Sequence, residues 1–153
     1  MSGVASLFLD TNVLAYARDI SEPAKHAKAQ ALLDEIFLAG LPVLSTQVLA
    51  EYFWTVTRKI PVPLTLDEAT ADTNRVIALT MVVPITLELF QAALQAVAQH
   101  GLPLWDAQIL AAARLSRSTT VLSEDFQNGQ TIGGVTFLNP FAAEFDLGRL
   151  LQT

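Results

Sequence analysis

Four acidic residues stand out because the sequence around each of them favours burial. Asp10 ends a short apolar run, and Asp106 lies in the first turn of a helix pattern that is apolar on nearly every side. Glu51 borders the apolar face of another helix pattern, and Asp125 follows a further apolar run. An ionised carboxylate in apolar surroundings is costly unless it is paired with a base or bound to a metal ion.

The chemistry that such a set could perform is metal-assisted hydrolysis. The chain has 9 Lys and Arg residues against 15 Asp and Glu, a net charge of −6, and no basic residue lies next to these acids in sequence. Oxygen ligands suit hard cations such as Mg²⁺ or Mn²⁺. One or two such ions can activate a water molecule for attack on a phosphodiester, and they turn an acidic pocket into a phosphate-binding one.

Each acid also has an ordinary structural explanation. Asp10 or Asn12 could cap a helix, Asp106 could complement a helix N-terminus, Glu51 could be solvated, and Asp125 could be a turn residue. The joint occurrence favours a carboxylate cluster. Around it, hydrogen bonds from Thr11 and Asn12 could orient Asp10, Ser123 could do the same near Asp125, and Glu124 competes with Asp125 for the fourth position.

Short apolar runs that alternate with helical patterns must position these acids. The strands are predicted at Val4–Leu9, Pro42–Leu44, Met81–Val83 and Thr119–Leu122, with a hairpin of Gln130–Ile132 and Val135–Leu138. The helices are predicted at Val13–Arg18, Pro23–Leu38, Gln47–Arg58, Thr65–Leu79, Thr86–Gln99, Leu104–Leu115 and within Phe141–Leu151. This alternation predicts a parallel, doubly wound α/β sheet, in which ligands bind at the carboxyl ends of the strands.

The composition narrows the remaining possibilities. A length of 153 residues predicts a single domain, 1–153. The absence of Cys excludes disulfides, zinc-thiolate sites and a thiol nucleophile. No stretch has the ~20 apolar residues that a membrane span needs, and no signal peptide is evident, so we expect a cytoplasmic protein. Charged residues make up only 16% of the chain, which favours a partner interface.

Two other groups of residues leave alternatives open. The aromatic side chains Tyr52, Phe53 and Trp54 could stack on unpaired bases, although packing in a core or an interface is their more common use. Five basic residues could border a path for RNA or could simply be solvated helix surface. They are Arg18, Lys25, Lys28, Arg58 and Lys59.

The four acids lie in segments that together resemble the motifs of PIN-domain nucleases, and most of all the VapC-type toxins of VapBC toxin–antitoxin modules. The segments are Phe8–Leu14, Ser45–Tyr52, Leu104–Ile109 and Val121–Gly129, the last followed by Asn139–Phe141. The resemblance covers nearly the whole chain in order and spacing. It implies a PIN-like three-layer α/β/α sandwich around a mostly parallel sheet.

The resemblance also implies a function. It is that of a Mg²⁺- or Mn²⁺-dependent endoribonuclease in which Asp10, Glu51, Asp106 and Asp125 occupy the metal-binding positions. Water would attack the phosphodiester in line and leave a 5′-phosphate on a tRNA, rRNA or mRNA. The implied assembly is a homodimer held by a small VapB-type antitoxin. The alternatives are a non-catalytic PIN-like scaffold that binds other proteins and a nuclease that acts on DNA.

Overall fold

The computed structural model describes residues 3–152, and six strands within this range form one sheet in the order β3-β2-β1-β4-β6-β5. Neighbouring strands are parallel except β5 and β6, which form an antiparallel hairpin. The predicted mostly parallel sheet is therefore confirmed. The strands are β1 Leu7–Leu9, β2 Val43–Ser45, β3 Met81–Val83, β4 Thr120–Leu122, β5 Thr131–Ile132 and β6 Val135–Leu138.

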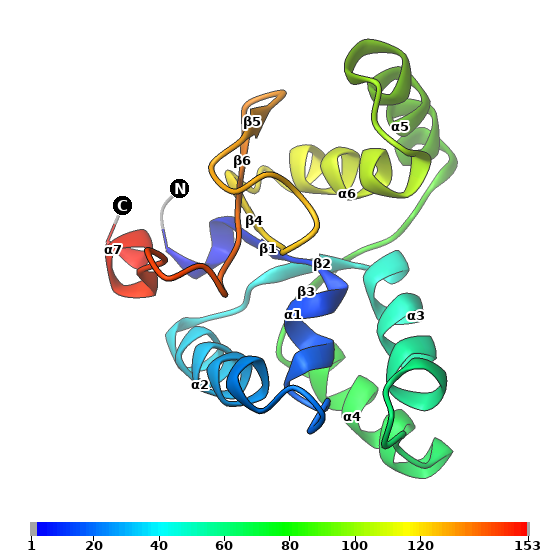
Figure 1. Ribbon diagram of the computed structural model, residues 1–153. Coiled ribbons are helices and arrows are strands. Elements are labelled where there is room, and N and C mark those ends of the chain that lie inside the picture. The colour runs from blue at the N-terminus through cyan, green and yellow to red at the C-terminus, as the bar shows by residue number, and fades with distance from the viewer. Residues whose placement is uncertain (1–2, 153) are drawn as a thin grey trace.

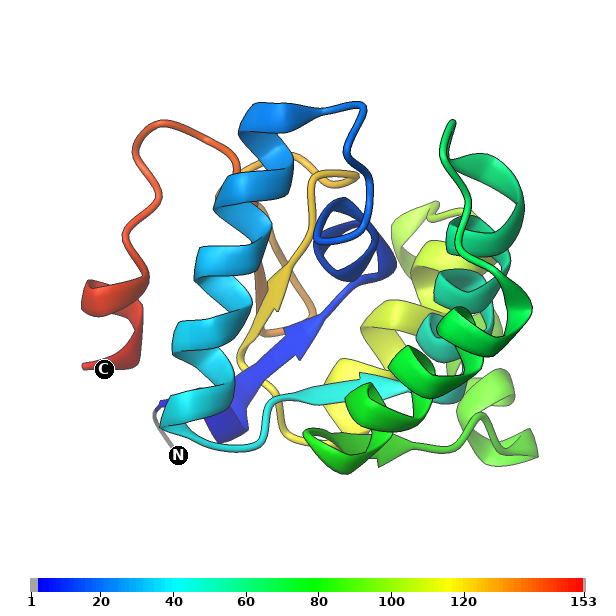
Figure 2. The ribbon, with the colours of Figure 1, turned by 90° about the horizontal axis from the view of Figure 1, so that it is seen from below.

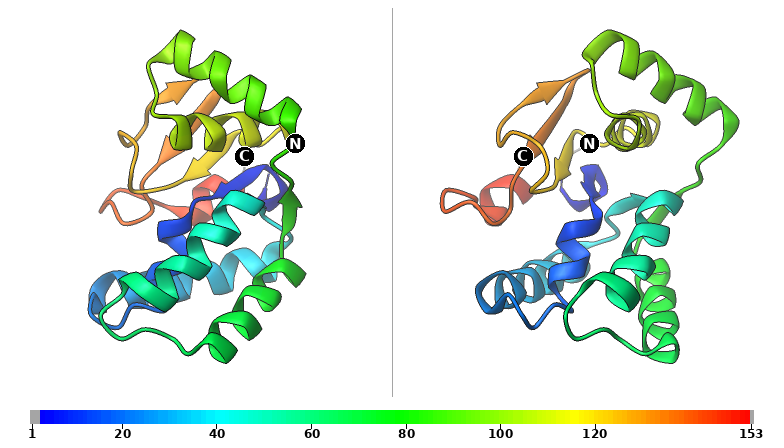
Figure 3. Two further views of the ribbon diagram at one scale, coloured as in Figure 1. Left: turned by 90° about the vertical axis from the view of Figure 1, so that its right-hand side faces the viewer. Right: turned by 45° about the vertical axis from the view of Figure 1, so that its right-hand side comes forward.

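Helices cover both faces of the sheet, as the α/β/α prediction requires (Figures 1 and 3). Helices α5 and α6 lie on one face, and α1 to α4 lie on the other. Figure 2 shows α1 between α2 and the pair of α3 and α4. The helices are α1 Thr11–Tyr16, α2 Pro23–Ala39, α3 Thr46–Trp54, α4 Leu66–Ala78, α5 Leu87–His100, α6 Leu104–Leu115 and α7 Leu147–Leu151, with a 3-10 turn η1 Val4–Ser6 and a π-helix η2 Thr55–Lys59.

The central strands β1, β2 and β4 are buried along their whole length because helices cover both of their faces. Leu7, Phe8 and Leu9 of β1 are all buried. After β1 the chain builds outward through β2 and β3, and it then returns to place β4 on the other side of β1. Open α/β sheets bind ligands at such a reversal of strand order. The register pairs Leu9 with Leu122 there, so the residues that follow β1 and β4 emerge side by side.

Helix α6 is apolar nearly all round because it packs between the sheet and α5. Every residue from Ala107 to Ala113 is buried. The connection from α5 turns at Gly101, whose φ of 66° lies in the left-handed region that favours glycine. The first turn of α6 therefore brings Asp106 close to the carboxyl edge of the sheet, where its charge interacts with those of Glu51 and Asp125. Among residues 3–152, no helix is both long enough and apolar enough to span a bilayer.

Three local predictions were wrong in detail. The strand predicted at Val4–Leu9 is shortened to Leu7–Leu9, because Ser6 donates two hydrogen bonds to the Gly3 carbonyl and closes a 3-10 turn. Helix α1 begins one residue after Asp10, so Asp10 and not Asn12 is its N-cap. The helix predicted to run regularly to Arg58 changes to π-helical winding at Thr55.

Candidate active site

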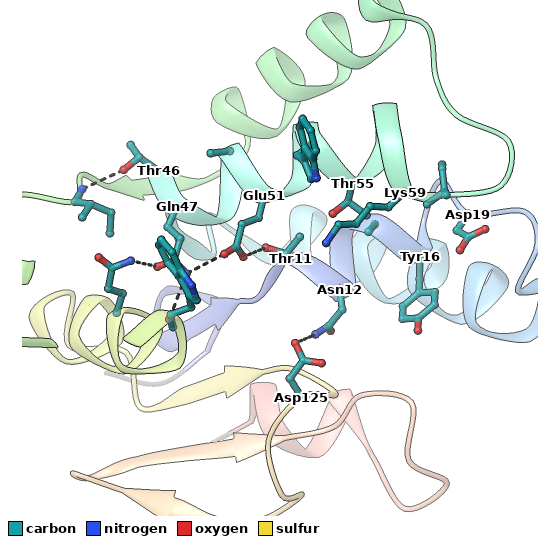
Figure 4. A pocket seen from close by; sticks show the side chains of 17 residues that line it. Thr11, Asn12, Tyr16, Asp19, Thr46, Gln47, Glu51, Thr55, Lys59 and Asp125 are labelled. Carbon is teal, nitrogen blue, oxygen red and sulfur yellow. Dashed lines mark hydrogen bonds between the residues drawn. The ribbon is translucent and has the colours of Figure 1, made fainter. Parts of the chain in front are cut away.

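A cleft of about 1000 Å³ opens where the strand order reverses (Figure 4). Its walls come from α1, α3 with η2, the first two turns of α6, and the loop that follows β4. Glu51 and Asp125 line the cleft from opposite sides of Thr11 and Asn12. The structure therefore places the segments that carry all four predicted acids around one cavity.

Asp10 is the most enclosed of the four acids, with only 5% of its surface exposed. Its carboxylate accepts hydrogen bonds from the Thr11 backbone N–H at 2.7 Å and from the Ser123 hydroxyl at 2.7 Å. Burial nevertheless raises the pKa of Asp10 to about 6, and the negative charges of Asp125 and Glu51 contribute to the rise. At neutral pH this carboxylate is ionised at a considerable cost.

Asn12 joins the ends of β1 and β4 but does not contact Asp10. Its amide nitrogen donates to Ser123 Oγ and to Asp125 Oδ2, each at 3.2 Å. Its amide oxygen accepts from the backbone N–H of Glu124 at 3.3 Å. The expectation that Asn12 orients Asp10 directly is therefore wrong, because Asn12 acts through Ser123 and fixes the loop that carries Asp125.

Glu51 is held by side chains from two elements. The Thr11 hydroxyl donates to Glu51 Oε2 at 3.1 Å, and Gln47 Nε2 donates to Oε1 at 3.2 Å. Gln47 in turn accepts from Gln108 Nε2 at 3.0 Å and donates to the Trp105 carbonyl at 3.2 Å. This chain of amides connects Glu51 on α3 to the first turn of α6, where Asp106 lies.

The Asp106 carboxylate has no hydrogen-bond partner within the described part of the chain. Burial raises its pKa, and the charges of Asp125 and Glu51 raise it further. The negative charges of the acids therefore repel one another. Among residues 3–152 none of the four forms an ion pair with Lys or Arg. Within that range, however, no three acidic or histidine side chains stand close enough together to hold a metal ion in their present positions.

The two candidates for the fourth position have different partners. Glu124 accepts from the Tyr16 hydroxyl at 2.6 Å and pairs with Lys25 Nζ at 2.8 Å. Asp125 instead lines the cleft, accepts from Asn12, and raises the pKa of Asp10 and Asp106. A carboxylate that is already paired with a base is a poor candidate for a cation ligand, so the geometry favours Asp125.

Sequence reasoning missed part of the cleft wall. Gln47, Thr55, Trp105 and Gln108 all line it, but none of them was singled out. The spacing of Gln47 and Glu51, four residues apart on one helix, predicts that they share a face and could have identified Gln47. Trp105 gave no such signal, because a large apolar residue at the start of an apolar helix is usually part of the core.

Comparison with known families decides the classification. The family model described as "PIN domain" matches residues 7–127, which is most of the chain. The chain belongs to the PIN domain family. The region matched includes all four acids of this PIN domain and the strands β1 and β4, after which Asp10 and Asp125 lie.

Two solved structures share the fold of this PIN domain. VapC20 of Mycobacterium tuberculosis, described as a sarcin–ricin loop cleaving toxin, superimposes with a TM-score of 0.63 at 19% identity, over 78% of this chain and 90% of that one. VapBC2 of Rickettsia felis, bound to a DNA fragment from its promoter, gives a TM-score of 0.60 at 15% identity, over 86% of this chain and 96% of that one. No curated protein sequence matches the chain.

Proposed function

We propose that this PIN domain is a divalent-metal-dependent endoribonuclease that acts as the toxin of a type II toxin–antitoxin pair. The observation that carries the proposal is that Glu51 and Asp125 line one cleft, that Asp10 and Asp106 adjoin the lining residues Thr11 and Trp105, and that no base pairs with any of the four within residues 3–152. Two of these acids have a raised pKa, to which the charges of Glu51 and Asp125 contribute. A cation in the cleft would relieve this repulsion.

The four carboxylates fit Mg²⁺ or Mn²⁺ by donor type, because both ions prefer oxygen ligands. The side chains would have to draw together around the ion, since no three of them converge as they stand. No hydrogen bond within residues 3–152 holds the Asp106 carboxylate in its present position. When bound, the ion would lower the pKa of a water molecule and polarise a phosphate oxygen.

The protein groups have separate roles in this proposal. Ser123 and the Thr11 backbone fix the position of Asp10, while Asn12 holds the loop that carries Asp125. The Asp106 carboxylate accepts no hydrogen bond within residues 3–152, so its oxygens remain available to the ion.

RNA is the proposed substrate and a small VapB-type antitoxin is the proposed partner. VapC20 is described as cleaving the sarcin–ricin loop, which supports RNA over DNA, and VapBC2 supports a toxin–antitoxin pair. Large apolar side chains such as Leu38 and Leu87 are exposed. They provide surface for the antitoxin and for a homodimer.

The direct test is cleavage of a pool of tRNA and rRNA by the partner-free protein in Mn²⁺, Mg²⁺ or EDTA, with single-stranded DNA in parallel. We expect metal-dependent cleavage of RNA. Asp10→Asn and Asp106→Asn should each reduce it by more than about 100-fold, the upper range of losses caused by outer-shell residues.

Asp34→Asn is the charge-matched control, because Asp34 is an exposed residue of α2 that does not line the cleft. It should cleave like the parent. Glu124→Gln tests the fourth position against Asp125→Asn, and only the latter should lose activity. Cleavage by Asp10→Asn at the parental rate would refute the assignment, and preferential cleavage of DNA would refute the substrate.

A further inference from the structure

The cleft wall formed by α3 and η2 carries a row of polar side chains spaced four residues apart. Gln47, Glu51, Thr55 and Lys59 all line the cleft. In a regular α-helix such a row drifts steadily around the axis, because one turn holds only about 3.6 residues. Lys59 would then turn away from the acids at the other end of the row.

The π-helical winding of η2 reverses this drift. The Ile60 N–H bonds to the Thr55 carbonyl at 3.2 Å, an i to i+5 bond that marks the wider turn. Lys59 is thereby kept on the face that holds Glu51, and Figure 4 shows its side chain extending into the cleft toward Asn12. The irregular winding therefore places a positive charge beside an otherwise acidic cavity.

Two indole rings line the same cleft. Trp54, on α3, is 55% exposed and Trp105, on α6, is 62% exposed. Both belong to the cleft lining, and they are the two tryptophans of the chain. Tyr52, two residues before Trp54, is buried, so α3 directs one aromatic residue to the core and another to the cleft. Two exposed indoles in a cleft that also holds the Glu51 and Asp125 carboxylates offer flat surfaces for a ligand with π faces.

The cations on this wall lack acidic partners in the described chain. Arg18, Lys25 and Arg75 form the ion pairs found within residues 3–152, whereas Arg58 and Lys59 form none there. The Arg58 guanidinium lies 5.6 Å from the centre of the Trp54 ring. An indole flanked by an unpaired guanidinium and an unpaired ammonium group suits a ligand that combines a flat ring with a nearby anion.

We infer that Trp54, Trp105 and Lys59 form a binding subsite for unpaired nucleotides, in which each indole stacks on a base and Lys59 contacts a backbone phosphate. Nucleotides supply both the π face and the anion. A basic peptide would suit the carboxylates but would be repelled by Arg58 and Lys59. The inference rests on the proposed function for the identity of the reaction, but the stacking itself requires neither metal nor cleavage.

Intrinsic fluorescence can test each indole separately, because Trp54→Phe leaves Trp105 as the single tryptophan and Trp105→Phe leaves Trp54. A mixed-sequence single-stranded RNA oligonucleotide is titrated into each variant, in EDTA and in Ca²⁺. We expect saturable quenching of both indoles and little quenching by the same RNA annealed to its complement. In parallel, anisotropy of a labelled oligonucleotide should show that Trp54→Ala and Trp105→Ala each weaken binding by roughly 5- to 100-fold.

Lys59→Gln should weaken binding and reduce its dependence on salt. The control is Leu94→Ala, which removes an exposed apolar side chain from α5 outside the cleft and should bind like the parent. Equal affinity of both Trp→Ala variants and the parent overturns the subsite, as does loss of antitoxin binding with unchanged oligonucleotide binding. Trp-dependent binding without cleavage in Mn²⁺ would refute the proposed function but leave the subsite intact. Cleavage that is independent of both tryptophans would refute the subsite but leave the proposed function intact.

Discussion

Two buried aspartates of this PIN domain have almost the same exposure and opposite surroundings. Asp10 is 5% exposed and Asp72, on α4, is 8% exposed. Burial raises the pKa of Asp10 to about 6. Burial acts in the same direction on Asp72, but hydrogen bonds from Arg18 and Tyr52 and the charges of Arg18 and Arg75 outweigh it and lower its pKa. Burial alone therefore does not distinguish a structural carboxylate from a functional one.

The side chains that contact each carboxylate distinguish the structural acids from the acids around the cleft. Asp72 joins α4 to the turn after α1 through Arg18 and to α3 through the Tyr52 hydroxyl, so it ties together segments behind the cleft. Glu124 is likewise paired, with Lys25 and Tyr16. The four acids around the cleft have hydroxyl and amide donors, or none, in place of cations. Within residues 3–152, Asp72 and Glu124 are paired with bases, whereas the four acids around the cleft are not.

The largest effect expected from breaking this contrast is at Asp72. Asp72→Asn should lower the free energy of unfolding by about 2–4 kcal/mol, because it removes the charge that Arg18 and Arg75 face and weakens the bond to the buried Tyr52 hydroxyl. The loss should fade as the pH falls below 3.8, the ordinary pKa of the carboxyl. Urea denaturation of Asp72→Asn measures this loss of stability, with Asp34→Asn as the control. Parental stability of Asp72→Asn would contradict the structural role.

Asp10→Asn should raise the free energy of unfolding, the opposite of the effect expected for Asp72→Asn. A rise in pKa from 3.8 to about 6 corresponds to about 3 kcal/mol of destabilisation once the carboxyl ionises. The altered bond to Ser123 offsets part of that, so we expect the metal-free variant to gain about 1–2 kcal/mol at pH 8. Urea denaturation in EDTA gives the difference.

The pH dependence of that gain tests its cause. Asp10 binds its proton more tightly in the native state than in the unfolded chain. The free energy of unfolding therefore falls as the pH rises from 3.8 to about 6, and the loss is constant at higher pH. The advantage of Asp10→Asn should therefore be full above pH 7 and disappear near pH 4. A gain that persists unchanged at pH 4 would show that charge is not its source.

Glu124→Gln should have the smallest effect, a loss of about 0.5–1 kcal/mol, because the Lys25 pair is partly exposed and screened by solvent. High salt should shrink the difference. A loss comparable to that of Asp72→Asn would place Glu124 among the structural acids that hold the fold.

The sequence was sufficient to predict the alternation of strands and helices and the mostly parallel sheet, and the reason is physical. Apolar runs such as Leu7–Leu9 can be satisfied only in a covered parallel sheet, and an acid at the end of such a run must then lie at the carboxyl edge. The helix predicted at Leu104–Leu115 was likewise encoded locally and is confirmed.

Pairings between distant segments could not be predicted in the same way. Whether Glu124 or Asp125 faces the cleft depends on Lys25 and Tyr16, about 100 residues away in the chain. The π-helical winding of Thr55–Lys59 has no marker in the sequence, so neither the position of Lys59 nor the exposure of Trp54 followed from the helix pattern. Tertiary contacts determine these features.

The central claim is that the four unpaired acids bind a divalent cation together. Isothermal titration of Mn²⁺ into the metal-free protein at pH 7.5 tests it most directly, with Asp10→Asn, Asp106→Asn and Glu124→Gln beside the parent. The account predicts saturable binding to the parent and to Glu124→Gln, and binding at least about 10-fold weaker for Asp10→Asn and Asp106→Asn. Absence of binding to the parent, or equal binding to all four proteins, would contradict it.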